Sequence, residues 1–290
     1  MAVTETKRGF TLIELAIALA IVGLLLGGLS VPLSKRLAEQ QYAETQASMD
    51  KAMDALVGFA LMNGRMPCPD ISTTVADNRD GLEDQGTSGG TTCGVGANTG
   101  TFNYTNSSDA GGASWGDLPW KTLGLPPPNN ADAWNNRFRY AVVTNLATID
   151  AGDANSFNED VLSTTTMLQV RCGNPTTTTP TTAAPGCLAA TYTVSDNVAF
   201  VVYSLGPNGW GSTSINNLTT RKPFTAAQIT LTPDQAANAP EAEATLALRR
   251  QFVTRDRTDA SSTAGEFDDL LSFMSSTKLA SKLLNAGKWP

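Results

Sequence analysis

"KRGFTLIELAIALAIVGLLLGGLSVPLSKR" (residues 7–36) decides how the rest of the chain is interpreted. Between Phe10 and Leu33 the only ionisable side chain is Glu14. A run of about 20 apolar residues crosses a bilayer as a helix, so residues 10–33 predict a transmembrane helix. On insertion scales, a charged side chain at the centre of such a helix costs about 2.5–3.5 kcal/mol. The stretch therefore predicts that the carboxylate of Glu14 has a partner that compensates its charge.

Two plainer interpretations of this stretch leave the carboxylate unexplained. A secretory signal has a shorter apolar core and ends in a small-x-small cleavage site, and a plain membrane anchor needs no charge at all. Lys7 and Arg8 precede the apolar run, which predicts a cytoplasmic N-terminus by the positive-inside rule. Lys35 and Arg36 follow the run and weaken that bias, so export of the long downstream part sets the direction of insertion.

The stretch "KRGFTLIEL" (residues 7–15) resembles the class III signal of type IV pilins and type II secretion pseudopilins. In that signal a short basic leader and a glycine precede Phe-Thr-Leu-Ile-Glu, which opens an apolar helix. The resemblance implies that a prepilin peptidase removes residues 1–9 by cleavage between Gly9 and Phe10. It also implies that the new N-terminal residue, Phe10, is N-methylated.

The resemblance gives Glu14 a role in assembly. Cleavage would create a positive amine on Phe10, and in a filament the Glu14 carboxylate of one subunit would meet the Phe10 amine of its neighbour. A buried carboxylate is costly when unpaired and tolerable when paired, so Glu14 is expected to fix the register of neighbouring helices. A contact within one chain stays open, because residues 10 and 14 share a helix face. It also stays open that the carboxylate of Glu14 is favoured at this position only by the helix dipole.

Composition limits the function classes. The 290 residues are 41% hydrophobic, which is enough for a packed core. The chain has no histidine, which excludes histidine-based triads, histidine metal ligands and histidine proton shuttles. The formal charge of −7 argues against a nucleic-acid partner. Because the sequence also has no GxSxG motif and no phosphate-binding loop, we predict that the protein is not an enzyme.

Four cysteines predict disulfides in an oxidising compartment. They are Cys68, Cys93, Cys172 and Cys187, and no two of them form a CxxC pair. Three pairings exist, and the sequence favours Cys68–Cys93 with Cys172–Cys187. Each of these bridges would close a local loop and stabilise the fold by about 3 kcal/mol. Free buried thiols are the alternative.

The remaining pattern predicts an α+β fold, and the resemblance implies that this fold is pilin-like. Apolar residues recur at three- and four-residue spacing up to Leu61, so residues 34–62 are expected to continue the helix as an amphipathic half. Asn63-Gly64 is expected to end that helix. It would pack on an antiparallel sheet with long, disulfide-pinned loops in a β-rich domain, residues 63–290. Strands are expected at Phe138–Val143, Thr166–Val170, Ala190–Val194 and Val198–Ser204, with a late strand in residues 249–259 and a terminal helix from Asp268 to Asn285.

One acidic loop is a candidate metal site. "DNRDGLED" (residues 77–84) places the oxygen ligands of Asn78, Asp80, Glu83 and Asp84 around a glycine, as in part of a calcium loop. The EF-hand spacing fails, because its first ligand position falls on an alanine and its last on a threonine. A solvated acidic turn is the alternative. No other cofactor is expected.

The resemblance implies a structural subunit, a minor pilin or pseudopilin of a type IV pilus or a type II secretion filament. The alternative is a filament-displayed adhesin or ligand-binding subunit. The expected partners are prepilin peptidase, other pilin or pseudopilin subunits, an inner-membrane platform protein and its ATPase. Before assembly the chain would cross the bacterial inner membrane once, with its C-terminal domain in the periplasm, and afterwards it would belong to a periplasmic or surface filament.

Overall fold

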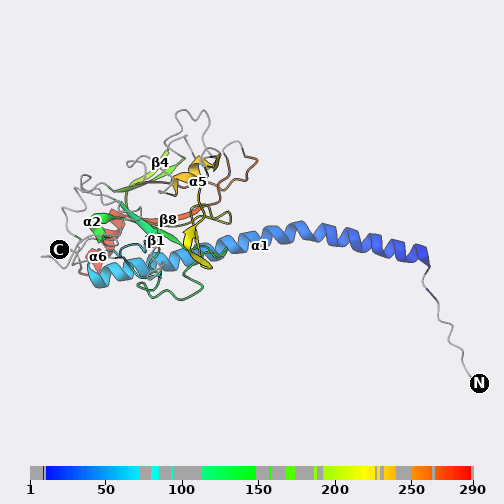
Figure 1. The fold of residues 1–290 in the computed structure, drawn as a ribbon, viewed down its shortest axis with the longest axis horizontal. Coiled ribbons are helices and arrows are strands. Elements are labelled where there is room, and N and C mark those ends of the chain that lie inside the picture. The colour runs from blue at the N-terminus through cyan, green and yellow to red at the C-terminus, as the bar shows by residue number, and fades with distance from the viewer. Residues whose placement is uncertain are drawn as a thin grey trace, which may run out of the picture. The chain divides into compact units, whose positions relative to one another are not determined.

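The computed structural model describes residues 9, 11–71, 80–84, 93, 113–147, 157, 167–173, 186–187, 192–225, 227–228, 232–239, 250–262 and 265–288. Side chains are described for all of these except residues 25–33, 192 and 217–221. The chain divides into two units, Met1–Ala43 and Glu44–Pro290. Helix α1 (Leu12–Asn63) begins in the first unit and ends in the second (Figure 1).

The C-terminal part of α1 buries the apolar positions that the sequence periodicity predicts. Its fully or almost fully buried hydrophobic residues are Met49, Ala52, Leu56, Val57 and Ala60. The helix ends at Asn63, and Gly64 adopts the left-handed conformation with φ of 67°. The amide of Gly64 donates to the carbonyl of Ala60 at 3.0 Å. Glycine takes this conformation without a steric penalty, so the Asn63-Gly64 pair ends the helix as expected.

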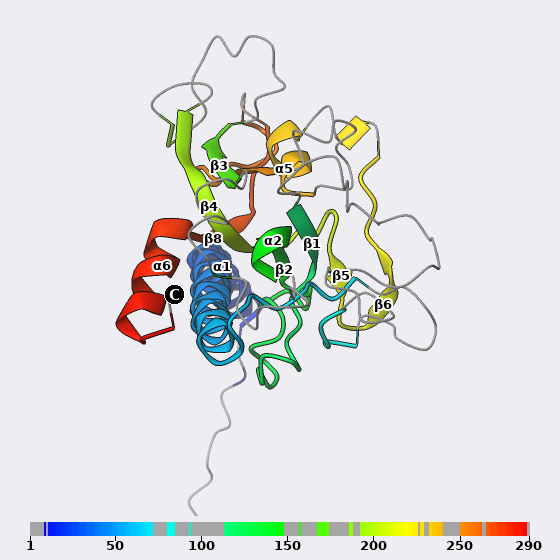
Figure 2. The ribbon, with the colours of Figure 1, turned by 90° about the vertical axis from the view of Figure 1, so that its left-hand side faces the viewer.

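A six-stranded sheet forms the centre of the second unit. Its strands are β1 (Ala113–Asp117), β2 (Arg139–Val143), β3 (Leu168–Cys172), β4 (Tyr192–Ser204), β7 (Gln251–Val253) and β8 (Leu270–Ser275). The order is β1-β2-β4-β3-β7, and β8 also pairs with β4. Three strands therefore pair with β4, which is 13 residues long and connects the whole sheet. Figure 2 shows β4 extending from beside β3 toward β8.

The sheet departs from the predicted one in three ways. The two strands expected at residues 190–194 and 198–204 are the single strand β4. The sheet is not wholly antiparallel, because β7 runs parallel to β3. The strand β1, which contains Trp115, is not among the strands that the sequence predicts, and it pairs with all of β2. Each difference comes from pairing between distant segments, which local pattern does not report.

The terminal helix begins later than predicted. Residues 270–275 were expected to form its first turns but are strand β8, which pairs with β4 from Leu270 opposite Ser204 to Ser275 opposite Val198. Only helix α6 (Ser276–Asn285) follows, and the Ser275 hydroxyl caps it by accepting the Lys278 amide at 3.3 Å. A half-buried apolar run fits a strand as well as a helix, and pairing with β4 decides between them. Figures 1 and 2 both place α6 beside the C-terminal end of α1.

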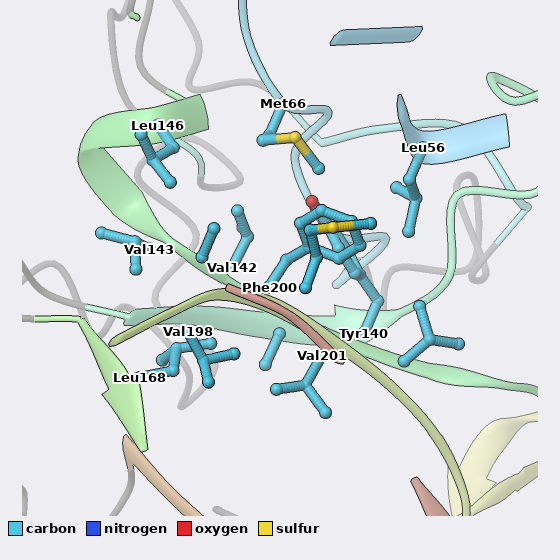
Figure 3. Packing of buried hydrophobic residues seen from close by; sticks show 14 of the residues in the cluster. Leu56, Met66, Tyr140, Val142, Val143, Leu146, Leu168, Val198, Phe200 and Val201 are labelled. Atoms are coloured by element: carbon cyan, nitrogen blue, oxygen red, sulfur yellow. The ribbon is translucent and has the colours of Figure 1, made fainter. Parts of the chain in front are cut away.

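Four short elements complete the described fold. Two are the helices α2 (Thr144–Ala147) and α5 (Pro233–Ala237), and the other two are the strands β5 (Thr213–Ser214) and β6 (Asn217–Arg221), which form a two-stranded sheet. The main core lies between α1 and the sheet. Leu56 of α1 and Met66 pack with Tyr140 of β2 and Phe200 of β4 (Figure 3). The buried Tyr140 hydroxyl is satisfied by donating to the Pro67 carbonyl at 3.1 Å.

Polar contacts also hold the C-terminal part of α1 in the second unit. The Thr45 hydroxyl accepts the Ala133 amide at 3.1 Å, and the Gln46 amide nitrogen Nε2 donates to the Ser272 hydroxyl at 3.2 Å. Thr45 is fully buried. From Glu44 onward the helix is therefore an integral part of the folded domain.

Candidate processing and assembly site

Gly9 precedes the first helix and is exposed, with no regular secondary structure. A Cβ atom built on Gly9 meets no atom within 4 Å, so nothing in the described fold requires glycine here. Phe10, the other residue of the expected cleavage site, lies outside the described residues.

Thr11 and Glu14 form a reciprocal cap at the start of α1. The Glu14 amide donates to the Thr11 hydroxyl at 3.3 Å. The Thr11 amide and hydroxyl both donate to Oε2 of Glu14, each at 3.3 Å. This arrangement is a capping box, in which two backbone donors at a helix start are satisfied by side chains. The pattern Thr-x-x-Glu is a local signal of such a cap, and it can be read directly in the sequence.

The first turns of α1 expose a large apolar surface in the isolated chain. Glu14 itself is exposed, and so are all described side chains from residue 11 to residue 24. The large hydrophobic ones are Leu12, Ile13, Leu15, Ile17, Leu19, Ile21, Val22 and Leu24. A soluble monomer rarely shows so much contiguous apolar surface, so this stretch of α1 is suited to contact with lipid or with other helices. Among helices built from described residues, none is long and apolar enough to qualify as a membrane span.

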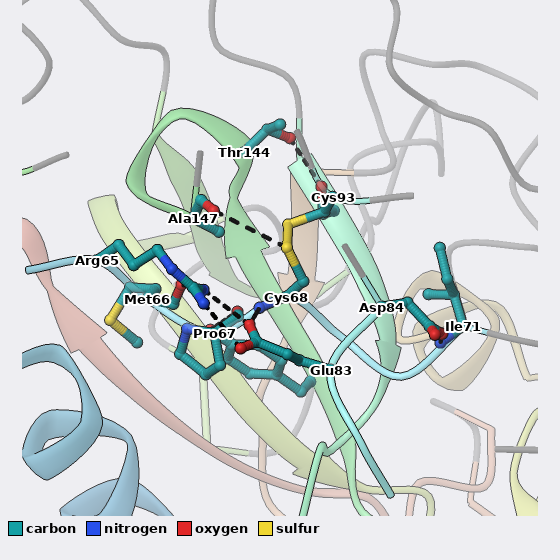
Figure 4. Close-up of a disulfide and its surroundings, with 12 residues drawn as sticks. Arg65, Met66, Pro67, Cys68, Ile71, Glu83, Asp84, Cys93, Thr144 and Ala147 are labelled. Atoms are coloured by element: carbon teal, nitrogen blue, oxygen red, sulfur yellow. Dashed lines mark hydrogen bonds and ion pairs between the residues drawn. A yellow bond between two sulfur atoms is a disulfide. The ribbon is translucent and has the colours of Figure 1, made fainter. Parts of the chain in front are cut away.

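The two disulfides are the ones that the sequence favours. Cys68 is bonded to Cys93 and Cys172 to Cys187. Figure 4 shows the first of these next to a charged pair that the sequence analysis did not predict. The guanidinium of Arg65 donates to both oxygens of Glu83, each at 2.7 Å, and the same carboxylate accepts the Cys68 amide at 3.0 Å. This two-bond contact ties the end of α1 to the acidic loop.

The four candidate calcium ligands are only partly described. Asn78 lies outside the described residues. Glu83 is engaged by Arg65, and Oδ2 of Asp84 accepts the Ile71 amide at 2.6 Å. Asp80 accepts the Leu82 amide at 2.9 Å, which closes a tight local turn. Within the described part of the chain, no three acidic or cysteine side chains gather closely enough to hold a metal ion. Calcium binding stays a prediction.

A buried acid lies beside this loop. Asp70 is 1% exposed, and its Oδ2 accepts the Gly81 amide at 2.7 Å. Burial raises the pKa of Asp70 to about 8, and the charge of Asp117 adds to this shift. The guanidinium of Arg137 contributes an opposite charge nearby. The sequence marked neither Asp70 nor Arg137, because neither belongs to a recognisable motif.

No curated protein matches the chain, and no solved structure matches it. The N-terminal segment does match a family model. Residues 6–30 fit the model described as the prokaryotic N-terminal methylation motif. The matched segment contains the exposed Gly9 and the Thr11–Glu14 cap. The chain therefore carries the signature of the prepilin-type signal found in type IV pilin and pseudopilin precursors.

Proposed function

We propose that the protein is a structural subunit, a minor pilin or pseudopilin, of a type IV pilus or a type II secretion filament. Prepilin peptidase cleaves the chain between Gly9 and Phe10 and methylates the new amine. Residues 10–33 anchor the precursor in the inner membrane, with the remainder in the periplasm. An inner-membrane platform protein and its ATPase then transfer the helix into the filament.

The observation that carries this proposal is the position of Glu14. It stands at the start of an exposed apolar helical surface, four residues after Phe10, where the motif implies cleavage. The capping contacts at 3.3 Å satisfy part of the hydrogen-bonding capacity of its carboxylate. They do not neutralise its charge. A filament core is a low-dielectric environment, where an uncompensated carboxylate is strongly unfavourable.

Processing would create the missing cation. The amine of Phe10 appears only after the leader is removed, so an unprocessed precursor would have no such partner for Glu14. A neighbouring subunit, shifted along the filament axis, brings its amine to Glu14 in one register only. This links cleavage to assembly through a single ion pair. The two disulfides agree with folding of the larger unit in an oxidising compartment.

The proposal is tested by expressing the full chain in cells that contain a complete filament assembly system, with and without an active prepilin peptidase. We expect the processed chain in the sheared or detergent-resistant filament fraction, together with other pilins. Without the peptidase the chain should keep its leader and stay in the inner membrane. Incorporation of an uncleaved chain would contradict the proposal.

A further inference from the structure

Two adjacent acids lie buried where β8 begins. Asp268 and Asp269 are each 6% exposed and directly precede the first residue of β8. Three other segments meet them: the turn Gly206–Gly211 after β4, helix α5 with Asn238, and β7 with Arg255. This corner has no role in the proposed function, and the sequence pattern marks Asp268 only as the start of an expected helix.

Asp268 holds the turn. Its Oδ2 accepts the Asn208 amide at 3.1 Å, and its Oδ1 accepts the Asn208 side-chain nitrogen at 2.7 Å and the side-chain nitrogen of Gln235. The turn sits directly on this residue, because a Cβ atom on Gly206 would come within 2.6 Å of the Asp268 carbonyl oxygen. Loosening Asp268 therefore releases both the turn and α5.

Asp269 holds α5 and β7 together. Its Oδ2 accepts the side-chain nitrogen of Asn238 at 2.8 Å. The same Asn238 side chain pairs with the backbone of Val253, accepting its amide at 2.7 Å and donating to its carbonyl at 2.9 Å. The side-chain amide of Asn238 thus pairs with β7 as the backbone of a neighbouring strand would. The hydrogen bond to Asp269 fixes the orientation of this amide.

The charges in this corner do not balance. The charged groups that act on the pair in the described part of the chain are Asp234 from α5, Arg255 after β7, Lys222 after β6 and Glu266 before β8. Arg255 forms an ion pair with Asp234 at 2.5 Å. The amine of Lys222 donates to the Asn208 carbonyl at 2.6 Å. Among the described residues, neither Asp268 nor Asp269 forms an ion pair.

Bound protons account for this excess of carboxylates better than a metal ion does. No set of described acidic side chains in the corner has the arrangement that a metal requires. Oε1 of Gln235 is buried and has no hydrogen-bond partner among the described residues. Rotating that amide by half a turn would present Oε1 to Asp268, where a protonated carboxyl donates to it. Burial raises the pKa of Asp268 to about 7. Burial, followed by the charge of Asp268, raises the pKa of Asp269 well above its usual range.

We propose that Asp268 and Asp269 form a proton-linked clasp, which fastens the Gly206–Gly211 turn and helix α5 to the start of β8 and loosens locally as the pH rises. The usual pKa of an aspartate is 3.8, so an opened corner is ionised across most of the accessible pH range. Between that value and the pKa of the closed state, the closed form holds a proton that the open form has lost. Opening is therefore favoured about tenfold per pH unit for each proton held.

Hydrogen–deuterium exchange of the full chain in detergent, corrected for the intrinsic pH dependence of amide exchange, tests the clasp. We expect protection in the turn and in residues 233–238 to fall by about tenfold per pH unit for each proton held, so by up to about a hundredfold per unit for the pair, between roughly pH 5 and pH 7. Protection in β2, a wholly buried strand that reports global opening, should stay higher than protection in the corner at every pH and serves as the internal control. A corner whose protection does not change with pH overturns the proposal. So does protection in the corner that equals protection in β2 at every pH, because the corner would then open only when the whole fold opens.

Two variants separate proton linkage from a merely structural role. Asp269→Asn removes the repulsion within the pair while its oxygen still accepts from Asn238, and the double variant Asp268→Asn with Asp269→Asn removes both titrating groups. The single variant should lower the pH slope of protection, and the double variant should abolish it. Asp196→Asn, at an exposed position of β4, should leave the slope unchanged. A double variant that loses protection equally at every pH, with the wild-type slope intact, contradicts the clasp.

Discussion

The Thr11 hydroxyl donates to the Glu14 carboxylate and accepts the Glu14 amide, both at 3.3 Å. Glu14 therefore has two separable properties: it caps α1 within its own chain, and it carries a charge into an apolar helix. Glutamine serves at the same position of a capping box as well as glutamate does. A substitution can thus remove the charge and keep the cap.

Glu14→Gln should leave membrane association intact and lower the fraction of the chain recovered in filaments by at least about tenfold, because the buried amine of a neighbour would lose its counter-charge. The matched control is Thr11→Ala, which removes the cap and keeps the charge. It should cost about 1 kcal/mol at the helix start and reduce incorporation far less. Quantitative immunoblotting of membrane and filament fractions compares the two. Equal losses would assign Glu14 to capping alone.

The Arg65–Glu83 pair should be a major local contribution to stability. Glu83→Gln should lower the free energy of unfolding by about 2–4 kcal/mol, because it leaves the guanidinium of Arg65 largely buried without its counter-ion. Both side chains are at most 15% exposed. Asp54→Asn, at an exposed position of α1, should change stability by less than about 0.5 kcal/mol. Urea denaturation measures both, and equal effects would contradict the assignment.

Two glycines should respond in opposite directions to replacement by alanine. Gly58 lies within α1, where a Cβ meets nothing within 4 Å, so Gly58→Ala should raise the free energy of unfolding by about 0.5–1 kcal/mol. A Cβ on Gly116 of β1 would come within 2.6 Å of the Asp70 carbonyl. Gly116→Ala should therefore destabilise the fold by about 1–3 kcal/mol. Denaturant midpoints report both, and a stabilising Gly116→Ala would show that the strand contact is wrong.

Loss of either disulfide should destabilise the larger unit by about 3 kcal/mol, since the closed loops are similar in length. The sequence separations are 25 residues for Cys68–Cys93 and 15 for Cys172–Cys187. Paired serine substitutions should cost more at the first bridge, because both of its cysteines are almost fully buried and a buried hydroxyl needs a partner. Denaturation of the two double variants gives the comparison. The reverse order would contradict it.

Asp70 should make the fold less stable at alkaline pH. Its pKa in the folded state, about 8, lies above the usual value of 3.8, so its stabilising proton is fully present below pH 3.8 and is lost as the pH rises to about 8. Over that window the free energy of unfolding should fall by up to about 1.4 kcal/mol per pH unit. Asp70→Asn should flatten this slope while still accepting the Gly81 amide. Chemical denaturation at several pH values measures the slope, and an unchanged slope in the variant would exclude Asp70.

The sequence predicted features that depend on neighbouring residues. The end of α1 at Asn63-Gly64 is a local signal, and so is the motif around Gly9 and Glu14. The cap between Thr11 and Glu14 was equally local and could have been found. The strand at residues 270–275 could not, since only its pairing with β4 distinguishes it from a helix.

Contacts between distant residues were beyond prediction for the same reason. Arg65 and Glu83 are 18 residues apart, and Asn208 and Asp268 are 60 apart. Neither pair produces a periodic pattern or a motif in the sequence. The fold has to be in place before such carboxylates acquire partners, burial and altered pKa values. The acidic loop illustrates this, because a set of ligand-like side chains turned out to include Glu83, which binds Arg65.

Mass spectrometry of the N-terminal peptide of the exported protein tests the central claim most directly. The account predicts a mature chain that begins at N-methylated Phe10, so that every assembled subunit offers an amine to a neighbouring Glu14. An exported protein that begins at Met1, or at a residue beyond the apolar part of α1, would contradict the account.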